Sequence, residues 1–491
     1  MAAISQADYA AQDATGLAEL VRRGEVTAGE LLDTAVERLE AVNGILNAVT
    51  ALHLDRARAM VADAGARGPF GGVPFLVKDL FTDVAGTVSD NGSAFHSPDP
   101  SSTSSAVVER YEAGGLVIFG RTHSPEFGGT STSESRRFGI TRNPFDLSRT
   151  AGGSSGGAAA AVAAGIIPAA QATDAGGSII IPSSCCGLFG LKPSRGRVPY
   201  GPARLEGGAG LAAQHVITRT VRDSAAFLDL ETSGEMVASL RPPSPRESFL
   251  ACLDLPLPRL RIAFARRSVA GMEPAPDCLA AVEKVAALCQ SMGHQVEEID
   301  LPVKAEDYAD AERAIRLASV TATIQALART IGRLPTEADL EPATWLRYQA
   351  GLSVKGTEVL DARERILAMG FAIQRFMQRY DVILSPAMAD LPPLPGTVTL
   401  DRTDDASAAL NRRYTTYTSF YNWTGQPSMT LPLHMSADGL PVGVLFAGRY
   451  GEEDLLLRLA AEFETAHPWT GLAPEESFMG KVVETSGRND G

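Results

Sequence analysis

Concentrated positive charge is missing from this 491-residue sequence. Its 44 Lys and Arg are outnumbered by 58 Asp and Glu, the formal net charge is −14, and the basic residues form no run. Because binding to phosphate groups needs a concentrated basic surface, a nucleic-acid partner is not expected. The sequence also lacks the roughly 18 uninterrupted apolar residues that a spanning helix needs, and its first residues show no secretory signal. We expect no membrane span and a cytoplasmic location.

Cysteine is scarce, and its spacing does not fit a metal site. The cysteines are odd in number and show no paired ligand spacing. They are Cys185, Cys186, Cys252, Cys278 and Cys289. This usage is typical of reduced, buried thiols in a cytosolic protein. The sequence therefore predicts neither a disulfide framework nor a metal centre.

Helical and apolar patterns are present, and they alternate along the chain. Thr27 followed by Glu30 fits a capping box at the start of an amphipathic helix. Strands are predicted from short apolar runs at residues 116–119, 260–265, 382–384 and 442–447, and helices at residues 104–113, 279–292 and 455–464. This mixture predicts an α/β fold with a mixed central β-sheet covered by helices on both faces. Residues 304–380 are almost entirely helical in pattern, which is compatible with a cap over a substrate entrance or with packing alone.

The most unusual segment is residues 152–193, which contains two Gly-Ser nests at residues 152–157 and 176–178. Glycine lets the backbone approach a ligand closely, and consecutive N–H groups in such turns can bind one anionic oxygen. A phosphate-binding loop is not matched, because GxxxxGK followed by Ser or Thr is absent.

A nucleophile elbow is matched only superficially. Gly152, Ser154 and Gly156 satisfy GxSxG, but the residues before them do not form the buried apolar strand that this motif should follow. The elbow also needs a later histidine, and His434 and His467 lie in no informative context. Taken alone, each nest is also compatible with an ordinary turn.

Both nests together with a lysine resemble the amidase-signature family. GGSSGG stands at residues 152–157, TDAGGS at 173–178 and GLKP at 190–193. Upstream, GGVPFLVKDL at 71–80 resembles the lysine segment of the family, and downstream, residues 422–449 resemble its C-terminal sheet segment. These five segments stand in the family's order and span nearly the whole chain. The resemblance implies one large catalytic domain, residues 1–475, followed by a tail, residues 476–491.

Carried over by position, the resemblance implies that Ser178 is the nucleophile, Ser154 the bridging serine and Lys78 the base. It also implies a cis peptide bond between Gly153 and Ser154. The oxyanion hole would consist of backbone N–H groups of residues 175–178, which are Ala175, Gly176, Gly177 and Ser178.

Further positions are implied to bind substrate or to support the triad. Ser155 and Asp174 would support it through hydrogen bonds. The acyl pocket would be lined by the small residues Gly128, Gly129, Thr130 and Ser131, which leave room for a bulky or extended acyl group. An apolar wall is predicted from scattered aromatic residues, Tyr308, Trp345, Tyr348, Tyr414 and Tyr417.

This chemistry is coherent on its own terms. A serine hydroxyl is a poor nucleophile until a neighbouring base removes its proton. A lysine can be that base only when it is neutral, and burial among apolar neighbours such as Phe75, Leu76 and Val77 would lower its pKa. The proton would pass from Ser178 through Ser154 to Lys78, and an acyl-enzyme would form and be hydrolysed by water. No metal or organic cofactor is required.

One departure from the family pattern concerns Asp174. The family usually has Arg two positions after the nucleophile, where this chain has Ile180. That arginine can pair with the acid of the TDxGGS element, so Asp174 needs other donors here. Arg195 and Arg197 are the candidates that we predict.

The sequence predicts a hydrolase of carbon–nitrogen bonds in small or medium amides, acting as a monomer or homodimer, with carbamates and esters as secondary substrates. Parts of it resemble bacterial hydrolases of the 6-aminohexanoate cyclic-dimer type. One alternative is the A subunit of a tRNA-dependent amidotransferase, whose usual SLDxxGP string is replaced here by AAQHVITRT at residues 212–220. The other is an inert binding protein on the same fold, against which the complete triad argues.

Overall fold

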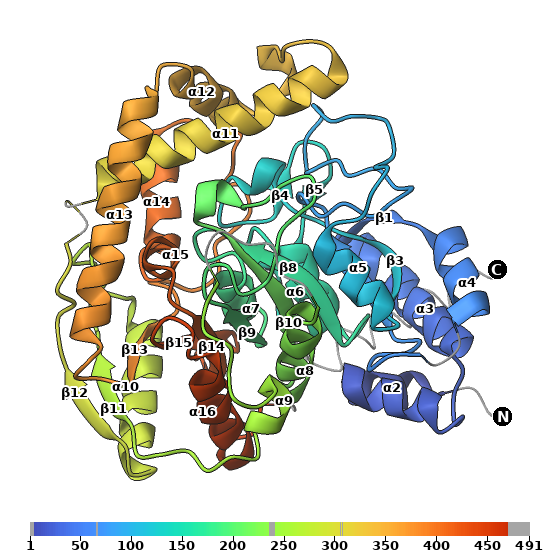
Figure 1. The fold of residues 1–491 in the computed structure, drawn as a ribbon, viewed down its shortest axis with the longest axis horizontal. Coiled ribbons are helices and arrows are strands. Elements are labelled where there is room, and N and C mark those ends of the chain that lie inside the picture. The colour runs from blue at the N-terminus through green and yellow to red at the C-terminus, as the bar shows by residue number, and fades with distance from the viewer. Residues whose placement is uncertain (1–3, 65–66, 235–240, 305, 307, 470–491) are drawn as a thin grey trace.

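The predicted strands assemble into one large mixed sheet (Figure 1). A computed structural model describes residues 4–64, 67–234, 241–304, 306 and 308–469. Within these residues the sheet has eleven strands, in the order β1-β3-β2-β8-β10-β9-β14-β15-β13-β11-β12. Their bounds are β1 (Val49–Leu52), β2 (Pro74–Lys78), β3 (Val117–Thr122), β8 (Ala169–Asp174), β9 (Phe189–Lys192), β10 (Ala213–Thr218), β11 (Arg261–Phe264), β12 (Gln295–Glu298), β13 (Val382–Pro386), β14 (Ser428–Met435) and β15 (Pro441–Ala447).

Two short two-stranded sheets lie outside the main one: β4 (Glu134–Ser135) with β5 (Gly139–Ile140), and β6 (Arg142–Asn143) with β7 (Asp146–Thr150). The helices are α1 (Gln6–Ala11), α2 (Ala14–Arg22), α3 (Ala28–Leu46), α4 (Leu54–Ala64), α5 (Ala106–Ala113), α6 (Gly156–Ala163), α7 (Ile180–Cys185), α8 (Val221–Glu231), α9 (Phe249–Cys252), α10 (Pro276–Ser291), α11 (Ala309–Ile331), α12 (Pro342–Gly351), α13 (Gly356–Phe376), α14 (Asp405–Thr415), α15 (Ser419–Thr424) and α16 (Glu453–Ala466).

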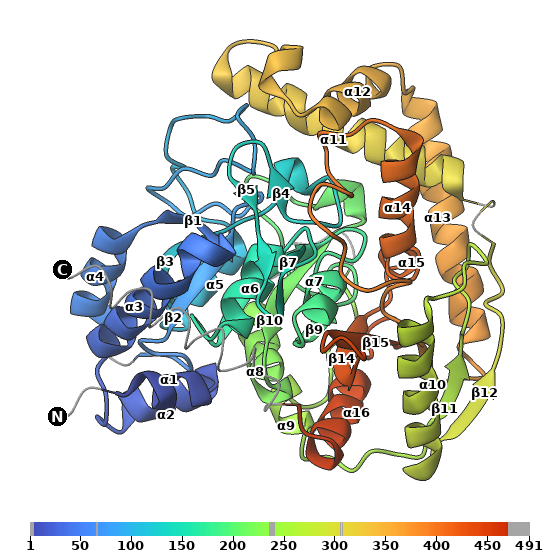
Figure 2. The same ribbon diagram turned by 180° about the vertical axis from the view of Figure 1, so that it is seen from behind.

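Helices cover both faces of the sheet, which confirms the predicted α/β class (Figures 1 and 2). On one face, α5 and α8 pack on β2 through an aromatic cluster in which Phe75 contacts the rings of Tyr111 and Phe227. On the other face, the first part of α6, Gly156 to Val162, is entirely buried. Its small side chains let this helix lie close to the strands that carry the site.

The local signals for individual helices are confirmed. Thr27 and Glu30 form the predicted capping box at the start of α3. The helical block at residues 304–380 consists of α11, α12 and α13, which lie together at one end of the molecule (Figure 1). All five cysteines are buried and free of disulfides. Within the described part of the chain, no helix is both long enough and apolar enough to cross a bilayer. The predicted tail, residues 476–491, lies outside the described residues.

The topology of the sheet brings two site segments together. Strands β2 and β8 are parallel neighbours, so their carboxyl ends meet at the same edge of the sheet. Lys78 is the last residue of β2, and Asp174 is the last residue of β8. The loop that follows β8 carries Ser178, and α6, which begins next to Ser154, packs against the same strand.

Candidate active site

Lys78 is completely buried and surrounded by hydroxyl groups. Its Nζ lies 2.7 Å from Ser154 Oγ, 2.9 Å from Ser155 Oγ and 3.0 Å from Thr173 Oγ1. Among the described residues, no carboxylate forms an ion pair with it. Burial lowers the pKa of Lys78 from 10.5 to about 7, and the nearby charge of Asp174 opposes this shift only in part. A large fraction of Lys78 is therefore neutral at neutral pH.

The three hydroxyl groups around Lys78 are not equivalent. A neutral amine has two N–H donors and one lone pair, so one of its three neighbours must then donate a hydrogen bond to nitrogen. Ser155 Oγ donates its proton to the Thr173 carbonyl oxygen at 3.2 Å, and it can only accept from Lys78. The lone pair of the neutral amine is thus available to Ser154 or Thr173.

The backbone around Ser154 fixes its position. The Gly153–Ser154 peptide bond is cis, as the resemblance implies. Ser133 Oγ accepts a hydrogen bond from the amide of Gly156 at 2.9 Å and donates one to the carbonyl of Ser154 at 3.3 Å. A Cβ atom added to Gly153 would lie 2.4 Å from the carbonyl carbon of Thr132. The chain can pass here only as glycine.

Asp174 organises the loop that carries Ser178. Its Oδ1 accepts from the amide of Gly177 at 2.7 Å and from Asn422 Nδ2 at 3.0 Å, and its Oδ2 accepts from the amide of Ile179 at 2.7 Å. The loop also packs tightly against the N-terminus of α15: at Gly177, where φ is +123°, an added Cβ would lie 2.2 Å from Thr418 Oγ1. Backbone amides and an asparagine thus donate the hydrogen bonds to Asp174 that we predicted from an arginine.

The prediction that Arg195 or Arg197 pairs with Asp174 is therefore wrong. Arg195 donates to the carbonyl oxygens of Asn422 and Trp423. Arg197 forms a buried ion pair with Glu453 at 2.7 Å. The carboxylate of Asp174 sits at a turn, where free N–H groups are already oriented toward it, so no cation is needed to satisfy its oxygens.

The predicted oxyanion donors divide into two groups. The amide of Gly177 is engaged by Asp174, and that of Gly176 makes a longer contact of 3.2 Å with the same oxygen. The amides of Ala175 and Ser178 have no hydrogen-bond partner within the described part of the chain. The structure thus differs from the prediction at Gly177, because the aspartate takes that donor for the folding of the loop.

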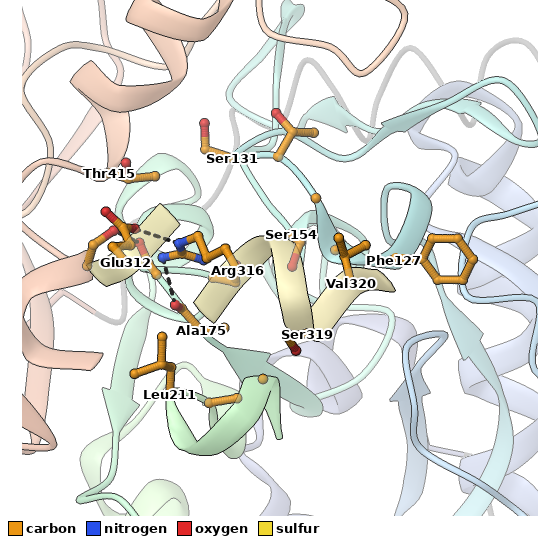
Figure 3. Close-up of a pocket in the computed structure, with 18 of the residues that line it drawn as sticks. Phe127, Ser131, Ser154, Ala175, Leu211, Glu312, Arg316, Ser319, Val320 and Thr415 are labelled. Carbon is orange, nitrogen blue, oxygen red and sulfur yellow. Dashed lines mark hydrogen bonds and ion pairs between the residues drawn. The ribbon is translucent and has the colours of Figure 1, made fainter. Parts of the chain in front are cut away.

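Both serines face a cavity of about 680 Å³. The predicted pocket residues Gly128, Gly129, Thr130 and Ser131 line it together with Ser154 and Ser178. Helix α11 lines the cavity with Glu312, Arg316, Ser319 and Val320, which Figure 3 draws among the lining residues. The helical block at residues 304–380 therefore contributes a wall of the cavity through α11, and it does not serve packing alone.

Comparisons with known proteins agree with this geometry. A family model described as amidase matches residues 30–457. The putative amidase AmiC of Mycobacterium tuberculosis is 36% identical over 93% of this chain and 95% of its own length. The 6-aminohexanoate-cyclic-dimer hydrolase of Paenarthrobacter ureafaciens is 33% identical over 94% of this chain and 96% of its own. The chain belongs to the amidase family.

Solved structures of amidases have the same fold as this chain. The structure of 6-aminohexanoate cyclic dimer hydrolase with substrate has a TM-score of 0.89 and 32% identity, and covers 95% of this chain and 99% of its own. A bacterial aryl acylamidase of the amidase-signature enzymes has a TM-score of 0.84 and 27% identity, over 96% and 98% of the two chains. This amidase is thus an enzyme that hydrolyses carbon–nitrogen bonds.

The predicted aromatic wall is only partly correct. Tyr308 lines the cavity of the amidase, whereas Trp345, Tyr348, Tyr414 and Tyr417 do not. Tyr348 packs instead with Trp345, and Tyr414 and Tyr417 are buried in the core. The aromatic residues that do line the cavity with Tyr308 are Phe81, Phe127, Tyr200 and Trp423. Isolated aromatic residues carry no signal in the sequence that separates a cavity wall from the core.

Three contributors were missed from the sequence. Thr173 contacts Lys78, and Asn422 holds Asp174. Asn411 Oδ1 accepts from the amide and the hydroxyl of Ser131, at 3.0 and 2.8 Å. Thr173 belongs to the TDAGGS element, so its role could have been predicted from the sequence. The two asparagines lie more than 200 residues away from their partners. Among the described residues, no group of His, Cys, Asp and Glu is arranged to hold a metal ion.

Proposed function

We propose that this amidase cleaves amide bonds through a covalent acyl-enzyme, with Ser178 as nucleophile, Ser154 as relay and Lys78 as base. The observation that carries the proposal is the 2.7 Å contact between Ser154 Oγ and the Nζ of a buried lysine whose pKa is lowered to about 7. Ser178 shares the cavity with Ser154 and has no hydrogen-bond partner within the described residues, so its hydroxyl can turn toward the relay.

The proposed roles of the two serines and the lysine define the steps of acylation and deacylation. Ser178 Oγ attacks the carbonyl carbon of the amide while its proton moves to Ser154 Oγ and the proton of Ser154 moves to Lys78 Nζ. The tetrahedral oxyanion accepts hydrogen bonds from the amides of Ala175 and Ser178, with Gly176 as a third donor that Asp174 holds only weakly. Lys78 returns a proton through Ser154 to the leaving nitrogen, the C–N bond breaks, and water then hydrolyses the ester by the same relay.

The substrate that we propose is a small or medium amide, with carbamates and esters as secondary substrates. The likeness to 6-aminohexanoate cyclic dimer hydrolase and to an aryl acylamidase supports extended or aryl amides, and a cavity of about 680 Å³ accommodates molecules of that size. We also propose that the enzyme is a monomer or homodimer. A cytoplasmic location is proposed from its five free cysteines, which are typical of a reducing compartment. The amidotransferase A subunit ranks second; at 22% identity, its solved structure is similar in fold alone.

A labelling experiment tests the nucleophile. A fluorophosphonate probe is expected to add one adduct to the intact protein, and peptide mapping is expected to find it on Ser178. Ser178→Ala should remove both the adduct and nearly all turnover, a loss of several kcal/mol in transition-state stabilisation. An adduct on Ser154 would contradict the proposed order of the serines. Turnover of amides, anilides and carbamates by the purified chain alone would exclude both the amidotransferase subunit and the inert binding protein.

A further inference from the structure

The cavity has the opposite charge balance to the whole molecule. The chain carries a net charge of −14. The charged residues that line the cavity are nevertheless mostly cationic: Arg204, Arg313, Arg316, Arg347 and Arg412 on one side of the balance, and Glu126 and Glu312 on the other. Arginine residues thus gather around the two serines of an acidic protein, which points to an anionic group in the ligand of the cavity.

Of the two glutamates, only Glu312 forms an ion pair with an arginine of the cavity among the described residues. Glu312 is bound to Arg316 in an ion pair of 2.5 Å, so these two charges cancel. Glu126 accepts from Ser93 Oγ at 2.7 Å and from the amide of Glu341 at 2.9 Å, and burial raises its pKa. The other arginines of the cavity form no ion pair with any described residue: these are Arg204, Arg313, Arg347 and Arg412.

Arg347, on α12, is bound to the glycine loop that passes the relay serine. Its side chain is half-buried, and its Nη1 donates to the carbonyl oxygen of Gly129 at 2.7 Å. The residue before, Gly128, is so close to the relay that an added Cβ would lie 3.3 Å from Ser154 Oγ. A guanidinium has five N–H donors, and this one contact leaves most of them available.

A second guanidinium, that of Arg316, contacts the loop that carries Ser178. Arg316 Nη2 donates to the carbonyl oxygen of Ala175 at 3.1 Å, at the start of the loop that carries Ser178, and Figure 3 shows it between Glu312 and Ser154. Its positive charge acts on Arg347 and, after burial, contributes to lowering the pKa of that arginine. Because Glu312 balances the charge of Arg316, the uncompensated positive charge here comes from Arg347, which forms no ion pair with any described residue.

We propose that the amide substrate of this enzyme carries a carboxylate, which binds Arg347 within the cavity. This inference rests on the proposed function and names its substrate class. A half-buried guanidinium without an acidic partner is incompletely solvated, and a carboxylate supplies both the charge and the paired acceptor oxygens that match its planar donors. The remaining unpaired arginines of the cavity raise the local concentration of such an anion and exclude cationic amides.

Chain-matched substrates test the proposal with the wild-type enzyme. Three p-nitroanilides with six-carbon acyl groups differ only in the terminal group: hexanoyl is neutral, adipoyl is anionic and 6-aminohexanoyl is cationic. A second pair places the charge on the amine side, as N-hexanoyl-4-aminobenzoate and its neutral carboxamide. In at least one series, kcat/KM for the anionic amide should exceed that for the neutral one by about 10- to 100-fold, the value of a charge-assisted hydrogen bond. The preference should shrink as ionic strength rises.

A pair of variants assigns the preference to the cavity. Arg347→Gln should bring the ratio of kcat/KM for the anionic amide to kcat/KM for the neutral amide close to 1, because glutamine keeps a donor for Gly129 but has no charge. Arg329→Gln removes the same charge from an exposed position of α11 that does not line the cavity, and should leave the preference intact.

The outcomes separate this inference from the proposed function. If no amide of either series is hydrolysed, the proposed function fails. If the neutral amides are hydrolysed as well as or better than the anionic ones in both series, the proposed function stands and the carboxylate is overturned. If Arg347→Gln slows neutral and anionic amides equally while Arg329→Gln does not, Arg347 only supports the loop at Gly129, and its role as the carboxylate partner is overturned.

Discussion

Lys78 ends a buried strand, and no acidic side chain among the described residues lies within ion-pair distance of it. Three hydroxyl groups contact its amine instead. Hydroxyl oxygens stabilise an ammonium less than a carboxylate does, so the cost of burial dominates and the pKa falls to about 7. A lysine in this setting exchanges a proton near neutral pH, as a general base requires.

The first expectation concerns the pH dependence of the rate. In the proposed mechanism the neutral form of Lys78 is the base. Its fraction grows as pH rises through the pKa, so kcat/KM for a neutral amide should climb between about pH 6 and 8 and then level off. Lys78→Ala should remove the climb and most of the rate. His434, which does not line the cavity, is the control, and His434→Ala should keep the wild-type profile. A profile that survives Lys78→Ala but is lost in a histidine variant would favour a histidine base.

In the loop between β8 and α7, backbone groups supply most of the hydrogen bonds that the carboxylate of Asp174 accepts. The amides of Gly177 and Ile179 and the side chain of Asn422 saturate the carboxylate. Ile180, where the family usually has arginine, is completely buried in an apolar cluster with Ile383 and Leu445. The position of Ile180 therefore offers neither space nor an unpaired acceptor to a cationic side chain.

A substitution at this position tests the account of the loop. Ile180→Arg should destabilise the protein by about 1 to 3 kcal/mol, because it overfills an apolar site and buries a charge whose natural partner is already satisfied. Urea unfolding measures the change, and Ile180→Val, which should cost only about 0.5 to 1.5 kcal/mol, is the matched control. A more stable Ile180→Arg enzyme with full activity would mean that Asp174 still lacks a partner.

Buried carboxyl groups shape the stability of the whole molecule. Burial raises the pKa of Glu341 to about 8, and its Oε2 has no hydrogen-bond partner among the described residues. The same cause raises the pKa of Glu134 and of Glu464 to about 7. These groups favour the protonated form in the folded state. Their contribution to stability is complete below the unfolded pKa near 4.5 and is lost as pH rises through the folded values.

Glu341→Gln should therefore flatten the pH dependence of the free energy of unfolding. Between about pH 5 and 8 the wild-type protein must hold a proton that the unfolded chain releases, and each such proton contributes a slope of up to about 1.4 kcal/mol per pH unit. The variant should lose about one proton's worth of that slope in urea unfolding at several pH values. Glu364→Gln, an exposed change on α13, is the control. Equal slopes in wild type and Glu341→Gln would contradict the assignment.

Much of this enzyme can be predicted from local patterns. Period-two and period-3.6 apolar patterns predict the strands and helices, and the capping box at Thr27 and Glu30 is a contact between near neighbours. The resemblance of the two Gly-Ser nests and the lysine segment to the amidase-signature family selects Lys78, Ser154 and Ser178 as the proposed triad. In the structure Lys78 Nζ lies 2.7 Å from Ser154 Oγ, and Ser154 and Ser178 line one cavity.

What no local pattern contains is the set of contacts between distant segments. Asn422 meets Asp174 across 248 positions, and Asn411 meets Ser131 across 280. The arginines of the cavity come from a loop, from α11, from α12 and from α14, and each of them alone is typical of a solvated surface. They line one cavity because of the way the helical block packs over the sheet. Sequence spacing does not encode distances between elements that meet only in the folded chain.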